Sequence, residues 1–145
     1  MKITIMERAD DEEDEIIIRC RHMDGRLLKL IYAIKAEQEK IVALKGKEYV
    51  QISPDEIYYF EAVDNKVFLY LEKEVYEVKQ KLYELEQKFQ GTDFFRASKS
   101  CIVNLAKVKN LSPAFNGRFE VHMKNGEKLM ISRQYVPGLK KKLGL

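Results

Sequence analysis

The chain is 145 residues long, the length of one domain with a short extension, which excludes a large multidomain enzyme. Hydrophobic residues make up 46% of it and charged residues 34%, values typical of a folded globular protein and not of a disordered one. No apolar run approaches the roughly 18–20 residues of a membrane span. The N-terminus becomes charged too early for a signal peptide, so we predict a cytoplasmic protein.

The charges are distributed unevenly along the chain. Residues 1–40 carry 8 basic and 10 acidic side chains, and residues 41–92 carry 7 and 10. Residues 93–145 carry 11 basic and 3 acidic side chains, a net charge of +8 in a chain whose total is +3. A basic third of this kind favours a polyanionic partner such as nucleic acid, although it also serves solubility.

The first 40 residues are expected to form an extension to the main domain. Two β-rich segments, 2–7 and 15–22, flank an acidic run at 10–15 that we interpret as a solvated loop. Residues 24–39 place apolar side chains at helical spacing among good helix formers, which predicts a helix. We expect this strand–strand–helix unit, residues 1–40, either to pack onto the domain or to mediate dimerisation.

Short strands separated by turns dominate the next part of the chain. A Pro-containing turn follows a predicted hairpin, and a helix ending at Gly91 interrupts the strands. The spacing predicts an antiparallel arrangement. The segments are a hairpin over 41–52, the turn 53–56, strands at 57–62, 67–71 and 75–78, and a helix over 79–90.

The C-terminal third continues the β pattern. Apolar and polar residues alternate over 119–123 and again after the tight-turn pair Asn125-Gly126, which predicts a hairpin. Ser132 is expected to cap a final helix, with Pro137 in its first turn. From 41 to 145 we therefore predict one domain of mainly β structure with minor α content, built from small antiparallel sheets.

Enzyme chemistry has few candidates in this sequence. His22 and His122 lack the Cys/His spacing of a zinc site, and the Ser–Lys pairs within 98–100 have no accompanying oxyanion element. We therefore predict no enzyme activity, no catalytic residues, no metal and no cofactor. Cys20 and Cys101 are far apart, so we expect buried, reduced thiols, with a disulfide as the alternative.

Three blocks of the sequence resemble the LytTR-type DNA-binding domain, the output domain of the LytR/AlgR family of transcriptional regulators. They are residues 52–62, 94–105 (Phe-Phe-Arg-Ala-Ser-Lys-Ser-Cys-Ile-Val-Asn-Leu) and 125–136, and they follow the order found in that family. The resemblance implies a fold of small antiparallel sheets. It also implies sequence-specific binding of double-stranded DNA, with loops between strands placed in successive major grooves.

By position in these motifs, the resemblance implies eight DNA-binding residues in three loops. An arginine can donate to guanine O6 and N7, an asparagine or glutamine can pair with adenine, a lysine can reach guanine or phosphate, and hydroxyl groups can bind phosphate oxygens. The residues are Asn65, Lys66, Ser98, Lys99, Ser100, Arg133, Gln134 and Tyr135.

Several of these positions also have a purely structural explanation. Asn65 could serve only the left-handed turn between two strands, and Arg133 could pair with Glu61. Asn104 lies among apolar residues, which indicates a side chain that binds backbone groups. The aromatic residues of the motifs are more typical of a core than of a base-stacking surface; these are Tyr58, Tyr59, Phe60, Phe94 and Phe95.

Residues 1–40 are too short for a receiver domain, so we expect the chain to resemble the compact stand-alone regulators of the family, some of which are associated with a small membrane protein. We expect it to bind imperfect direct repeats as a homodimer or in pairs. Two alternatives stay open. One is a single-strand or RNA-binding β module, and the other is a protein-interaction module that has lost its affinity for DNA.

Overall fold

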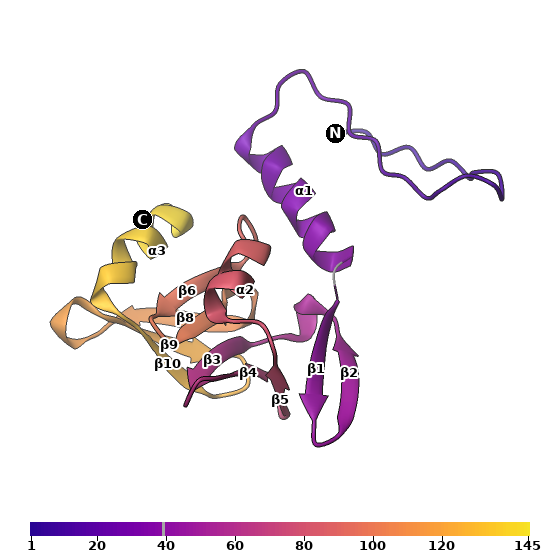
Figure 1. Ribbon diagram of the computed structural model, residues 1–145. Coiled ribbons are helices and arrows are strands. Elements are labelled where there is room, and N and C mark those ends of the chain that lie inside the picture. The colour runs from indigo at the N-terminus through magenta and orange to yellow at the C-terminus, as the bar shows by residue number, and fades with distance from the viewer. Residues whose placement is uncertain (39) are drawn as a thin grey trace.

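The computed structural model describes residues 1–38 and 40–145 (Figure 1), and for residues 36–38 it describes the backbone alone. The helices are α1 (Gly25–Gln38), α2 (Leu82–Lys88) and α3 (Val136–Leu143). Short 3-10 turns lie at Pro54–Glu56, Leu105–Lys107, Phe115–Gly117 and Arg133–Tyr135. The strands are β1 (Ile41–Lys45), β2 (Glu48–Ile52), β3 (Tyr59–Val63), β4 (Lys66–Tyr70), β5 (Val75–Val78), β6 (Phe94–Ser98), β7 (Cys101–Asn104), β8 (Val108–Pro113), β9 (Phe119–Met123) and β10 (Lys128–Ile131).

All strand pairs in the described chain are antiparallel, and they form two sheets. The larger has the order β2-β1-β5-β4-β3-β7-β6, and the smaller has the order β10-β9-β8. Both predicted hairpins are confirmed, with Ile41 opposite Ile52 in one and Phe119 opposite Ile131 in the other. The prediction of a β-rich fold with small antiparallel sheets is therefore correct.

The larger sheet carries a hydrophobic core on each face. One core lies against α2 and contains Phe60, Leu85 and Phe89. The other lies against the smaller sheet and α3, and contains Tyr59 and Leu139. Phe60 and its neighbour Tyr59 belong to different cores because successive side chains of a strand point to opposite faces. Most of the aromatic residues of the motifs are thus core residues, as expected, and Phe94 and Phe95 are partly buried against the cores.

The last helix begins later than the sequence suggested. Ser132 precedes a 3-10 turn at Arg133–Tyr135 and makes no capping hydrogen bond with its side chain. The N-cap of α3 is Tyr135, and Pro137 occupies the first turn, as expected. The capping prediction for Ser132 is therefore wrong, because the chain tightens into a 3-10 turn before it enters the α-helix.

The two strands predicted at 2–7 and 15–22 are absent: residues 1–24 form neither helix nor strand. Ile3 and Ile5 are 82% and 90% exposed, so no apolar surface covers them. A β-rich composition is not sufficient for a strand, because the backbone groups need a neighbouring strand as partner. The helix predicted over 24–39 is confirmed as α1, except that residue 39 lies outside the described residues.

Helix α1 touches the β domain through a small contact beside α2. The ring of Tyr32 packs directly on Gly91, whose positive φ of 81° also suits glycine. Lys29 Nζ lies 3.9 Å from a carboxylate oxygen of Asp93 in the same loop. The rest of the extension projects away from the sheets (Figure 1). None of the helices described is both long and apolar enough to cross a membrane.

Both cysteines are free thiols, and they differ in environment. Cys101 is buried at the start of β7, whereas Cys20 is exposed in the extension. Burial raises the pKa of the Cys101 thiol to about 12. The expected burial is thus confirmed for Cys101, whereas the expected burial of Cys20 is wrong, because its segment packs against no core.

Candidate nucleic-acid interface

The turn between β3 and β4 carries the first two predicted residues. Asp64 and Asn65 have φ angles of 52° and 64°, as a tight two-residue hairpin turn requires. Asn65 and Lys66 are both exposed. Lys66 Nζ lies 3.8 Å from a carboxylate oxygen of Glu77 on β5, a surface pair of little strength. The turn geometry accounts for an asparagine at 65, and its exposed amide remains available to a ligand.

The turn between β6 and β7 carries the next three residues. Its backbone is bulged between Arg96 and Ser98. Ser98 Oγ accepts a hydrogen bond of 3.2 Å from the Ser100 amide and lies 3.4 Å from Ser100 Oγ. Lys99, at the tip, is exposed. The turn therefore presents an ammonium group beside two hydroxyl groups, a combination suited to phosphate or to base edges.

The 3-10 turn that follows β10 carries the last three residues. Arg133 and Gln134 are exposed, whereas the ring of Tyr135 packs against the second core. The aliphatic stem of Arg133 crosses Gly117 in the turn between β8 and β9, where an added Cβ would lie 3.1 Å from Arg133 Cδ. Gly117 thus leaves room for the arginine side chain, a contact that the sequence alone did not indicate.

Two backbone hydrogen bonds bring these three loops to the same end of the larger sheet. The Ala62 amide, at the end of β3, donates to the Ser100 carbonyl at 2.8 Å. The Ser132 amide donates to the Ala97 carbonyl at 2.8 Å. We call residues 64–66, 98–100 and 132–135 together the loop edge.

The last two of these loops line one open depression. It measures about 420 Å³ and does not include Asn65 or Lys66, which lie in the neighbouring turn. Its lining residues are Ser98, Lys99, Ser100, Ser132, Arg133 and Gln134.

Two of the three cationic side chains of the loop edge have no acidic partner among the described residues, whereas Lys66 is paired with Glu77. Across the residues that the structure describes, no carboxylate pairs with Lys99 or Arg133, and the expected alternative of an Arg133–Glu61 pair does not form. Asn104, by contrast, has the structural role that its apolar neighbours indicated. Its side chain donates to the Ile57 carbonyl at 2.8 Å and accepts from the Ala106 amide at 3.1 Å.

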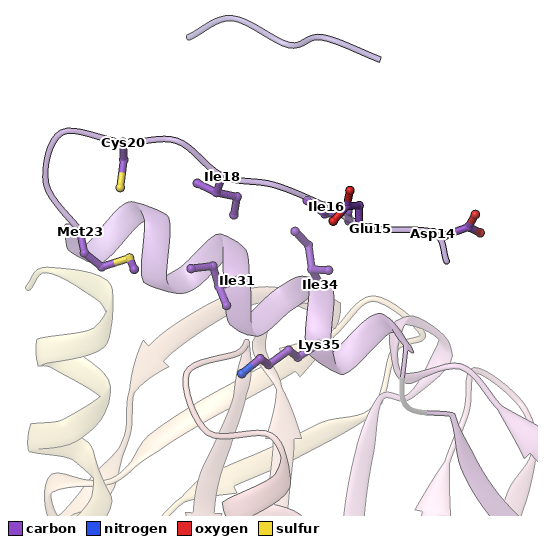
Figure 2. A pocket seen from close by; sticks show the side chains of 9 residues that line it. All are labelled: Asp14, Glu15, Ile16, Ile18, Cys20, Met23, Ile31, Ile34 and Lys35. Atoms are coloured by element: carbon purple, nitrogen blue, oxygen red, sulfur yellow. The ribbon is translucent and has the colours of Figure 1, made fainter. Parts of the chain in front are cut away.

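A second hollow, lined by more apolar residues, lies between the N-terminal segment and α1 (Figure 2). It measures about 490 Å³. Ile16 and Ile18 of the extended segment face Ile31 and Ile34 of the helix across this gap. The apolar stripe of α1 is therefore directed toward the extension and not into the cores of the sheets.

Comparison with known proteins gives these loops a family context. The model of the family described as the LytTr DNA-binding domain matches residues 47–144. The chain belongs to this family. The solved structure of a LytTr DNA-binding domain from Bacillus cereus superposes with a TM-score of 0.69 at 26% identity, covering 73% of this chain and 97% of that one. The chain thus carries a DNA-binding domain, and the loop edge lies within it.

Curated relatives extend the similarity beyond the LytTr domain. Sensory transduction protein LytT of Enterococcus faecalis is 30% identical over 94% of this chain and 57% of its own length. LytT of Bacillus subtilis is 32% identical over 74% of this chain and 45% of its own length. The chain therefore spans about half the length of these relatives. A Staphylococcus aureus protein named as an HTH-type transcriptional regulator is 26% identical over 100% of this chain and 99% of its own length.

Proposed function

We propose that this chain is a transcriptional regulator that binds a specific sequence of double-stranded DNA through the loop edge. One observation carries the proposal: three loops distant in sequence lie at one end of the larger sheet, and two of them present Lys99 and Arg133, which pair with no carboxylate among the described residues. Loops held by a sheet can enter a major groove, which is wide enough to admit protein elements and shows a distinct pattern at each base pair. The DNA-binding family of the chain supports the same conclusion, and the cytoplasm is the compartment it implies.

Each loop residue has a role that fits its chemistry. Arg133 donates its planar fork to guanine, and Gln134 or Asn65 pairs with adenine. Lys66 and Lys99 reach guanine or phosphate. Hydroxyl groups fix the position of the protein on the phosphate backbone. Those hydroxyl groups belong to Ser98, Ser100 and Tyr135. Of these, Tyr135 is partly buried, because its ring packs against the second core.

The structure gives less support to a single-strand or RNA-binding module. Such a module stacks bases on exposed aromatic rings. The aromatic residues of the first motif are Tyr58, Tyr59 and Phe60. All three are buried in the cores, so their rings present no surface on which bases could stack. The two alternatives differ from the proposal in what they bind. A single-strand or RNA-binding module would bind single strands of any sequence, and a protein-interaction module would bind no nucleic acid tightly even at low salt.

We further propose that two copies bind together on imperfect direct repeats. The extension offers a contact for a second copy, because its apolar side chains are exposed. Its acidic run at 10–15 also complements basic positions between Arg19 and Lys29. Light scattering should give a dimer mass for the full chain and a monomer mass for Ile17→Glu. Equal masses for the two proteins would contradict a dimer contact through the extension.

A small membrane-protein partner stays a prediction of the resemblance.

Selection of bound duplexes from a random pool tests the DNA-binding proposal. Recovery of a repeated motif, with copies about one helical turn apart, supports paired binding by a regulator. Affinity for the selected duplex should fall steeply with salt, because phosphate contacts release counterions. A pool that yields no motif at either of two salt concentrations would contradict sequence-specific binding.

Arg133→Ala tests the most specific role in the proposal. Loss of a bidentate contact with guanine should cost roughly 1–3 kcal/mol of binding free energy and relax discrimination at one base pair. Lys73→Ala is a matched control, since it removes one positive charge from the β4–β5 turn at the opposite end of the sheet. Equal discrimination by Arg133→Ala and the parent chain would show that Arg133 does not contact a base.

A further inference from the structure

Arg96 lies on β6, two residues before the 98–100 turn of the loop edge. Its side chain is only 20% exposed. Nε donates to the Ser98 carbonyl and Nη2 donates to the Lys99 carbonyl, both at 2.7 Å. Nη1 donates to Glu86 Oε2 on α2 at 3.0 Å. All three guanidinium nitrogens are thus engaged, and two of them hold the backbone of the turn that carries Lys99.

These contacts compensate for a weakness in the sheet. The register between β6 and β7 shifts between Arg96 and Ser98, so part of the turn lacks regular ladder bonds. Arg96 supplies donors to two of the carbonyls there, and the ion pair with Glu86 ties the guanidinium to α2. An arginine is suited to this task, because its donors form a rigid planar fork that a lysine cannot reproduce.

We infer that Arg96 is a positioning residue for DNA recognition, which fixes the 98–100 turn in the shape that presents Lys99 and the two serine hydroxyl groups to the duplex. The inference rests on the proposed function of the loop edge. We place the action of Arg96 in the turn and not on DNA, because each of its three guanidinium nitrogens already donates to a protein carbonyl or carboxylate and its side chain is only 20% exposed. An ordered turn binds more tightly because less freedom is lost on binding.

The test measures affinity for a selected duplex and for a scrambled one, each over a range of salt concentrations. Arg96→Lys keeps the charge but loses the fork, and Arg96→Ala loses both. For both variants we expect affinity for the selected duplex to fall about tenfold, with affinity for the scrambled duplex little changed. The slope of log affinity against log salt should stay that of the parent chain, because no phosphate contact is lost.

Lys73→Ala serves as the control for loss of one distant positive charge, and thermal melting shows whether each variant is folded. If Arg96→Ala fails to fold, Arg96→Lys decides. Parent-like affinity of Arg96→Lys for the selected duplex would overturn the inference. A salt slope reduced by about one in Arg96→Ala would also overturn it, by showing that Arg96 binds a phosphate directly. A parent chain that does not discriminate between duplexes would remove the proposed function, and the inference with it.

Discussion

At the scale of single residues, one position can have both a structural role and a proposed functional role. Asn65 adopts a positive φ that the hairpin turn requires, and its amide is exposed at the loop edge. The sequence alone could not separate these two roles, because asparagine is favoured by both. The structure shows the backbone role directly, and a substitution that preserves the backbone can isolate the other.

Asn65→Gly makes that separation. Glycine adopts positive φ at no steric cost, so the free energy of unfolding should stay within about 0.5 kcal/mol of the parent value. If the amide pairs with a base, binding to the selected duplex should weaken by roughly 1–3 kcal/mol. Urea unfolding and equilibrium binding measure the two quantities. Unchanged binding would assign Asn65 to the turn alone.

The two thiols should differ sharply in reactivity. Burial and the nearby Glu61 carboxylate keep the pKa of Cys101 at about 12, so at pH 8 it is a neutral, inaccessible thiol. Cys20 is exposed and should be alkylated first. Mass spectrometry of the native chain should show one rapid addition, on Cys20, and a second only on unfolding. Equally rapid modification of Cys101 would contradict its burial.

At the scale of elements, sequence periodicity predicted those parts whose partners are close in the chain. The hairpins at 41–52 and 119–131 were predictable because alternation and turn residues act over a few positions. The strands expected at 2–7 and 15–22 were wrong because composition says nothing about whether a partner strand exists. Arg96, beside the bulge in β6, also makes a tertiary contact with Glu86 that no local pattern indicates.

The packing of α2 should depend strongly on Phe89, the C-cap residue that directly follows the helix. The Phe89 ring is buried, with its centroid 4.4 Å from that of Phe94 and 6.1 Å from that of Phe60. Phe89→Ala should lower the free energy of unfolding by about 3–5 kcal/mol, because it leaves a cavity in the first core. Tyr83→Ala, on the exposed side of the same helix, should change it by less than about 0.5 kcal/mol. Urea unfolding of both variants measures the contrast, and similar losses would contradict the assigned core.

At the scale of the whole molecule, chain topology assembles the candidate site. Residues 66, 99 and 133 are distant in sequence, and their loops lie at the same end of the larger sheet because β3, β7 and β6 are neighbours and the Ser132 amide bonds to the Ala97 carbonyl of β6. The motif resemblance suggested which residues to assign to this candidate site. It could not predict that Gly117 and Arg96 would support them, since these contacts exist only in the folded chain.

The central claim is that the three loops of the loop edge form one DNA-contacting surface. NMR titration of the labelled full chain with a selected duplex tests it most directly. The account predicts that the largest amide shift changes occur in 64–66, 98–100 and 132–135, with little change in the β4–β5 turn at 71–74. Changes concentrated in the extension or in the β1–β2 hairpin, with the loop edge unaffected, would contradict it.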